Sequence, residues 1–215
     1  MARRLSVGGA TMAVLAVLAA GDAGAGITVF DNYAPGWEHC HGDSWGVGGA
    51  PGAEWGLEFI QMAMAFVPQQ GGPVSDIWLT TGHISGTNLL NVWLAQDLGG
   101  QPGTMIESWA VESQGPLYQD PLPTPPIHLL PQTSPVLEPG VQYWLVATPG
   151  AVDMTGGWYW NLQQVNGTRA YSIKGGDWQV DTHVQGAFRV DVVPEPATLS
   201  LLGLGGLGAL LRRRK

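Results

Sequence analysis

The 215-residue sequence contains a single cysteine, Cys40. An intramolecular disulfide is therefore excluded, and the fold must be held together by its core alone. We expect Cys40 to be a small buried side chain; an intermolecular link and a metal ligand are the alternatives.

Basic residues are scarce outside the two ends of the sequence. Between residues 26 and 193 only Arg169, Lys174 and Arg189 are basic, against fifteen acidic residues, which gives this region a net charge of −12. A surface this acidic repels phosphate backbones and anionic lipid headgroups. The sequence therefore predicts no nucleic-acid partner, whereas the same field suits a soluble extracellular protein, or one that binds neutral sugars or divalent cations.

The apolar run near the start is too short to span a membrane stably. Ala10–Ala20 has eleven residues, against the roughly 20 that a membrane-spanning helix requires. Arg3 and Arg4 precede this run, and Ala23-Gly24-Ala25 follows it with the small residues that signal peptidases accept. Residues 1–25 are therefore predicted to be a signal peptide, with the Sec translocon and signal peptidase as partners.

Helical periodicity is also lacking, because no window between residues 26 and 192 keeps a convincing 3.6-residue period for more than about ten residues. Short runs of β-branched and aromatic residues alternate with glycine and proline instead. Val74–Thr81, for example, places Ile77 and Leu79 on one face of a strand. Around ten such runs predict an all-β domain, a single jelly-roll-like β-sandwich over residues 26–192.

Some local assignments within this domain are less direct. Leu57–Phe66 alternates only in part, and its Met and Ala residues also allow a short helix. His39–Asp43 is interpreted as a polar loop. Hairpin turns are predicted at Asn166-Gly167 and at Gly175-Gly176-Asp177, because these residue types tolerate the positive φ of tight turns.

The C-terminal segment, residues 193–215, has three parts. Pro194, Glu195 and Pro196 form a rigid acidic tripeptide, which a processing enzyme can bind at low entropic cost. Ala197–Leu211 is almost wholly Leu, Gly and Ala and would rise about 22 Å as a short hydrophobic helix, less than the roughly 30 Å hydrocarbon core of a bilayer. The segment ends in four cations that favour the cytoplasmic face: Arg212, Arg213, Arg214 and Lys215.

This three-part segment resembles the PEP-CTERM sorting signal of exported bacterial proteins. The resemblance implies an exosortase as processing enzyme, transient insertion into the inner membrane, and a final location at the cell surface or outside the cell. Short runs of the middle region also resemble choice-of-anchor domains, which are β-sandwich modules attached to varied anchoring tails, and no catalytic residues come with that likeness. These runs are Thr28–Asn32, Val92–Leu94, Gly99–Gly103, Gln142–Leu145 and Gly186–Val190.

Two groups of side chains are candidate metal ligands. His39 and His41, with Cys40 and Asp43 beside them, are weak candidates for zinc or copper, because on a strand both imidazoles would share a face. The second group is predicted to lie in the loops of the C-terminal hairpins and offers carboxylates to calcium. It contains Asp153, Asp177 and Asp181. No other cofactor is predicted.

Ten tryptophans in one chain raise the hypothesis of sugar binding. Trp158, Trp160 and Trp178 lie close together in the sequence, and flat aromatic rings cover the C–H faces of sugars. Large aromatic side chains also fill the cores of β-sandwiches, so both interpretations are open at these three positions.

No arrangement of residues predicts catalysis, since the glycines around Ser44 do not form a G-x-S-x-G elbow. We therefore expect a non-enzymatic exported protein of the cell surface, extracellular matrix or biofilm, sorted by an exosortase-type system. A secreted carbohydrate-binding module acting on exopolysaccharide is the first alternative, with polysaccharide as partner. A secreted hydrolase is the second.

Overall fold

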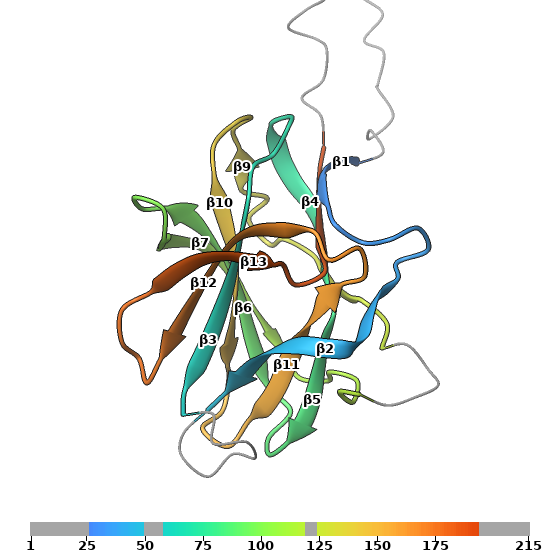
Figure 1. The fold of residues 1–215 in the computed structure, drawn as a ribbon. Helices are drawn as coiled ribbons and strands as arrows, with labels where there is room; N and C mark the ends of the chain where they lie inside the picture. The colour runs from blue at the N-terminus through green and yellow to red at the C-terminus, as the bar shows by residue number, and fades with distance from the viewer. Residues whose placement is uncertain (1–25, 50–57, 119–123, 194–215) are drawn as a thin grey trace, which may run out of the picture.

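The computed structural model describes residues 26–49, 58–118 and 124–193. Within these ranges the chain forms strands, turns and loops, and no helix long and apolar enough to cross a membrane is present. All pairings between the named strands are antiparallel, and the strands form two sheets that face each other as a sandwich (Figure 1). The prediction of an all-β sandwich is confirmed; the predicted signal peptide and C-terminal helix lie outside the described residues.

The smaller sheet brings together the first and last strands of the body. Its five strands, in the order of their pairing, are β1 (Ile27–Asp31), β14 (Phe188–Val192), β4 (Gly72–Leu79) and β8 (Ile127–Leu129), with β9 (Val136–Leu137) paired to the start of β4. In β4, Ile77 and Leu79 are fully buried and Trp78 points to the other face, as the sequence predicts.

The larger sheet has nine strands and is built around β3. One path runs through β5 (Thr81–Ser85), β11 (Thr155–Asn161), β2 (His39–Gly48), β3 (Ile60–Phe66), β10 (Tyr143–Pro149), β6 (Leu90–Asp97) and β7 (Pro102–Val111); β12 (Asn166–Ile173) and β13 (Gln179–Val184) branch from it. β3 pairs with β10 on one side and β12 on the other, whereas β2 reaches it through a single pair, Gly48 and Ile60.

The central strands of the larger sheet are buried on both faces. Met62, Met64 and Phe66 of β3 enter the main core between the sheets, while Ala63 and Ala65 enter a second cluster on the opposite face. This second cluster also contains side chains of β6, β10 and β12, with two partly buried indoles against it: Ala95, Trp144, Val146, Ala170, Trp93 and Trp178. Burial on both faces explains why this stretch lacks a clean two-residue alternation in the sequence. It is a strand, and the helical alternative is wrong.

The predicted turn at Asn166-Gly167 is also wrong, because Asn166 is the first residue of β12. The chain reverses earlier, between the end of β11 and the start of β12. The Asn161 side chain closes this loop by donating from Nδ2 to the carbonyl oxygen of Val165 at 3.0 Å and accepting the Val165 N–H at 2.7 Å. The second predicted turn is confirmed, since Gly175 (φ +68°) lies between β12 and β13.

Candidate functional site

The predicted sorting segment follows directly after the last strand. β14 is paired on both sides, with β1 and with β4, and Val192 is fully buried. The N–H of Val193 donates to the carbonyl oxygen of Pro73 at 2.8 Å. The described body therefore ends one residue before Pro194. The Pro194–Pro196 tripeptide and the terminal cations, residues 212–215, lie outside the described residues.

Both ends of the described body lie side by side. Ile27, in the first strand, is the register partner of Val192 in the last strand. Residues 26 and 193 therefore leave the sandwich at the same end, as Figure 1 shows. The junctions with the predicted signal peptide and with the sorting segment belong to one region of the molecule.

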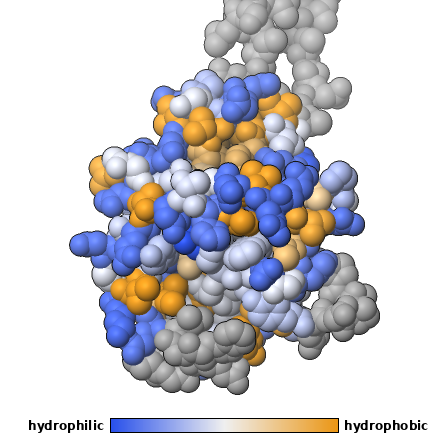
Figure 2. Space-filling view, viewed as in Figure 1, coloured by the Kyte–Doolittle hydropathy of each residue, from blue (hydrophilic) through white to orange (hydrophobic). Residues whose placement is uncertain are grey.

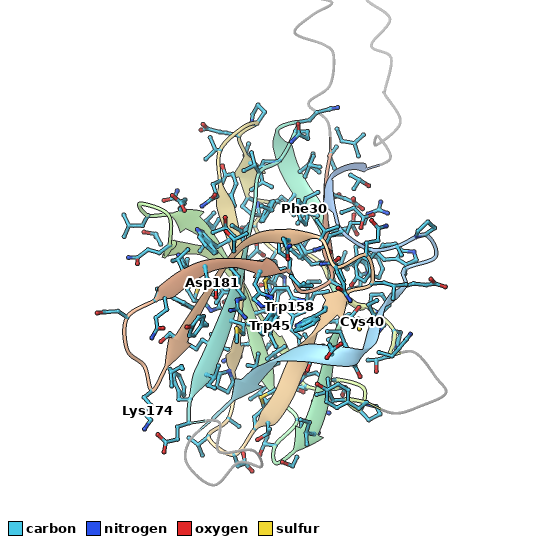
Figure 3. The ribbon with its side chains drawn as sticks, in the orientation of Figure 1. Phe30, Cys40, Trp45, Trp158, Lys174 and Asp181 are labelled. Carbon is cyan, nitrogen blue, oxygen red and sulfur yellow. The ribbon has the colours of Figure 1, made fainter. Side chains whose placement is uncertain are left out.

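The three tryptophans proposed for sugar stacking have different surroundings. Trp158, labelled in Figure 3, is fully buried, and its Nε1 donates to the Ala187 carbonyl oxygen at 3.0 Å, so its ring has no face open to a ligand. Trp160 is half-buried and lies 4.9 Å from Trp45, ring centroid to centroid. Trp178 is half-buried against the second cluster. Trp158 is thus a core residue, and the structure does not join the three rings into one platform.

The segment predicted as a polar loop around His39 forms the first part of β2, so that prediction is wrong. His39 is buried and His41 is exposed, with their ring centroids 4.6 Å apart. Cys40 is half-buried, contrary to the expected full burial, and its Sγ lies 3.7 Å from an Asp43 carboxylate oxygen. Within the described ranges no group of three or more His, Cys, Asp or Glu side chains is arranged to hold a metal ion.

The environment of His39 opposes its protonation. Neither ring nitrogen has a hydrogen-bond partner, and the ring lies 4.9 Å from that of Tyr159. Burial, with a smaller contribution from nearby His41, lowers the pKa of His39 to about 4. At neutral pH His39 is therefore an uncharged ring inside the body.

The three aspartates proposed for calcium do not all lie in loops as predicted, because Asp181 is part of β13. Thr87 donates to Asp153 and lowers the pKa of that carboxylate. Asp177 lies in the turn between β12 and β13. Asp181 accepts a hydrogen bond from Arg169 Nε at 2.9 Å and a second from Nη2, and these bonds lower its pKa. Calcium binding by this set stays a prediction.

The side chain of Arg169, a residue of β12, reaches Trp45 of β2. Its guanidinium carbon lies 3.7 Å from the centroid of the Trp45 ring and 5.2 Å from that of Tyr171. The Arg169 side chain is only 8% exposed, and its carboxylate partner Asp181 is 39% exposed. The carboxylate and the ring partners stabilise the desolvated guanidinium in this position.

We expect Asp181→Ala to lower the free energy of unfolding by about 2 kcal/mol, because it leaves the buried guanidinium of Arg169 without its counter-charge. Urea denaturation followed by far-UV circular dichroism measures this loss. Asp177→Ala is the matched control and should change the free energy by less than about 0.5 kcal/mol, since Asp177 is exposed. Equal effects of the two substitutions would contradict a structural role for the Arg169–Asp181 pair.

A groove runs past the end of β1, beside β3 and the β11–β12 loop. It consists of two hollows of about 460 and 440 Å³ that share Asp31, Tyr33 and Gln163 as lining residues. Six side-chain amides line it, so we call it the amide groove: Asn32, Gln69, Gln142, Gln163, Asn166 and Gln185. Its volume falls within the range of ligand sites, roughly 300–1,000 Å³.

Three of the six amides hold the groove in shape. Asn32 is buried, donates from Nδ2 to the Gly186 carbonyl oxygen at 2.8 Å, and accepts the N–H of Phe188 at 2.8 Å. Gln185, also buried, donates to the Ala65 carbonyl oxygen at 2.7 Å. Gln142 donates to Asp97 at 2.7 Å. These bonds tie the groove to both sheets, so its walls are preorganised.

The other three amides are free to bind. Gln69, Gln163 and Asn166 are exposed, and none of their side chains makes a hydrogen bond within the described part of the chain. Each amide offers two donors and one acceptor. Among the described lining residues the charged side chains are Asp31 and Arg189; Arg189 donates to Asp191 at 2.8 Å and lies 3.9 Å from Asp31.

Trp37 lies at one end of the groove in a strained conformation. Its φ is +68°, in the left-handed region that bulky residues rarely occupy, and such strain costs of order 1–3 kcal/mol. Contacts with three side chains hold the ring in place: Tyr33 at 5.4 Å, Trp78 at 5.1 Å and the Arg189 guanidinium at 5.0 Å. The residue is nevertheless 37% exposed, and it lines the groove.

Sequence reasoning did not identify the amide groove. Its free amides come from three separate segments, the turn after β3, the β11–β12 loop and the start of β12. A local signal near the groove is the Pro35-Gly36 pair before Trp37. This pair predicts a turn, but it does not predict where the Trp37 ring lies.

The comparison with protein families identifies the C-terminal segment. The model of the PEP-CTERM protein-sorting motif matches residues 192–215, from the last residue of β14 to Lys215. No curated protein matches the chain, nor does any solved structure. The resemblance of the middle region to choice-of-anchor domains stays a prediction. The motif implies export, processing by an exosortase and sorting to the cell surface. The chain is therefore a PEP-CTERM domain-containing protein, in which an all-β body directly precedes the sorting motif.

Proposed function

We propose that the protein is a non-enzymatic component of the cell surface or extracellular matrix, delivered there through its PEP-CTERM motif. The match at residues 192–215 is the observation that carries this proposal. Within the described residues the last strand of the body, β14, is already paired on both sides, with β1 and with β4. Removal of the following residues would leave a finished sandwich.

The chemistry of the amide groove supports a role without catalysis. Amide groups do not take up or release protons near neutral pH, so they cannot act as general acids or bases. Asp31 is the carboxylate among the described residues that line the groove, and Arg189 lies 3.9 Å from it. Burial raises the pKa of Asp31, but no second carboxylate and no histidine, cysteine or serine is among the described residues that line the groove.

In the proposed sorting step, residues 197–211 enter the inner membrane and the terminal cations keep the end of the chain on the cytoplasmic side. The processing enzyme then binds Pro194, Glu195 and Pro196. Three extended residues span at most about 10 Å, so this enzyme would work close to the folded body. The region that it approaches includes Pro73, which accepts the Val193 N–H.

Glu195→Ala tests the sorting step. In a host that contains the processing enzyme, we expect the variant to accumulate in the membrane fraction with its C-terminal peptide intact, because the acidic centre of the tripeptide is lost. Mass spectrometry of the C-terminal peptide distinguishes the processed from the unprocessed form, and membrane fractionation reports retention.

Glu112→Ala is the matched control, since it removes an exposed acidic side chain from the body and leaves the tripeptide intact. It should be processed as the wild type is. In a host from which the processing enzyme has been deleted, wild type and both variants should all be retained. The same mature C-terminus in Glu195→Ala and wild type would overturn the proposal.

A further inference from the structure

We infer that the amide groove binds a neutral oligosaccharide. This inference concerns the folded body and does not depend on how the C-terminal segment is processed. It assigns a sugar-binding role to residues other than Trp158, Trp160 and Trp178, namely Gln69, Gln163 and Asn166, with Trp37 as the stacking ring. The hydrogen-bonding groups, the apolar walls and the charge of the groove each support it.

The free amides match the hydroxyl groups of a sugar. A carboxamide has a donor and an acceptor side by side, and neighbouring sugar hydroxyls present the complementary pair. Gln163 lines both hollows, Gln69 and Asn166 line the larger one, and none of the three is engaged elsewhere in the described chain. Because Asn32, Gln142 and Gln185 are fixed by their own bonds, binding would order only the three exposed side chains.

Apolar side chains in the same groove match the C–H faces of sugar rings. Val67 and Val165 line the larger hollow and are 38% and 43% exposed. Trp37 adds a partly exposed indole in the smaller hollow. A bulky ring held at positive φ is typical of a site where backbone strain positions a functional side chain. On the face of the molecule drawn in Figure 2, apolar patches lie among hydrophilic residues.

The charge of the groove disfavours an anionic ligand. Arg189, the cation of the described lining, is already bound by Asp191 at 2.8 Å and lies 3.9 Å from Asp31, while the body around it carries a net charge of −12. An anionic polysaccharide would therefore be repelled, whereas a neutral one needs no counter-charge from the lining. An uncharged chain of several sugar rings fits two adjoining hollows of about 460 and 440 Å³.

Isothermal titration calorimetry on the full chain, solubilised in a detergent without a sugar headgroup, tests the inference. The probes are neutral hexasaccharides of β-1,4-glucose, α-1,4-glucose, β-1,4-xylose and β-1,4-mannose, with hexagalacturonate and a neutral serine- and glutamine-rich peptide for comparison. We expect saturable binding of at least one neutral hexasaccharide at millimolar concentration or below.

Substitutions then locate the site. The double variant Gln163→Ala/Asn166→Ala should raise the dissociation constant by roughly tenfold or more, since each lost hydrogen-bonding group contributes roughly two- to tenfold. Trp37→Ala should raise it by about tenfold through loss of the ring face. Gln70→Ala is the matched control, because Gln70 is an exposed amide next to Gln69 that does not line the groove. Unchanged circular dichroism and melting temperature show that each variant is folded.

Selective loss of binding in the groove variants supports the inference. Four results would overturn it: no neutral hexasaccharide binds, the groove variants bind as well as Gln70→Ala, hexagalacturonate binds more tightly than every neutral probe, or only the peptide saturates the site. Because the measurement does not involve sorting, a failure here leaves the result of the Glu195→Ala experiment unaffected, and the reverse also holds.

Discussion

Trp158→Ala should lower the free energy of unfolding by about 3–5 kcal/mol, the usual cost of truncating a large aromatic side chain in a packed core. Trp158 has no exposed surface, and its ring meets that of Phe188 at 5.9 Å, edge to face. The substitution removes these contacts and also the Nε1 hydrogen bond to the Ala187 carbonyl oxygen. Urea denaturation followed by far-UV circular dichroism measures the loss without relying on tryptophan fluorescence.

Two companion variants show whether the loss comes from packing. Val152→Ala, at a side chain that is 75% exposed, should change the free energy by less than about 0.5 kcal/mol. Gly186→Ala should cost about 1–3 kcal/mol, because a Cβ atom at Gly186 would lie 2.6 Å from the Trp158 ring. If Trp158→Ala cost less than Val152→Ala, the indole would not be in the core.

The stability of Trp158→Ala decides how a loss of sugar binding in that variant is interpreted. A variant at Trp158 would lose any ligand simply because part of the chain unfolds, whereas a variant at Gln163 or Asn166 removes an exposed side chain and leaves the core intact. The two kinds of loss are separated by measuring the melting temperature beside the affinity. Only the second kind identifies a binding residue.

The class of fold could be predicted from the sequence because most strands are marked locally. Ile77 and Leu79 alternate with Asp76, Trp78 and Thr80, and Gly175 supplies the positive φ of a turn. The sorting motif was equally accessible, since the tripeptide, the apolar stretch and the basic end are contiguous. Features that depend only on neighbouring residues are those that a sequence pattern carries.

The features that sequence reasoning missed depend on distant residues. β2 looked like a loop because its glycines and polar residues give no two-residue pattern, and it pairs with β11, more than a hundred residues away. The displaced turn is a local exception, because the Asn161 side chain closes the loop before Asn166 through its bonds with Val165. The amide groove joins three segments that no local pattern connects.

His39 provides the second large effect, a loss of stability as the pH falls below neutrality. The unfolded chain protonates this imidazole near its ordinary pKa of 6.5, whereas the folded protein does so only near 4. Between these values the unfolded state binds more protons, so the free energy of unfolding decreases as the pH falls from about 6.5 to about 4. A difference of this size corresponds to about 3 kcal/mol.

The substitution His39→Phe should remove this dependence. Phenylalanine keeps a ring beside Tyr159 and eliminates two buried nitrogens that lack partners, so the variant should be at least as stable as wild type at pH 7. The measurement is the urea midpoint at half-unit steps between pH 7.5 and 4, and the difference between wild type and variant isolates His39. Carboxylates with lowered pKa values, Asp97 and Asp181 among them, act below this window and cancel in the difference.

His41→Phe separates the effect of burial from that of charge. His41 is exposed, and its charge near His39 contributes to the lowered pKa of His39. The variant should therefore keep most of the pH dependence, with the lower end of the window moved slightly upward. Parallel curves for wild type and His39→Phe would show that His39 is solvated in the folded protein. In that case burial would not control its protonation, and the first part of β2 would be more open than the structure places it.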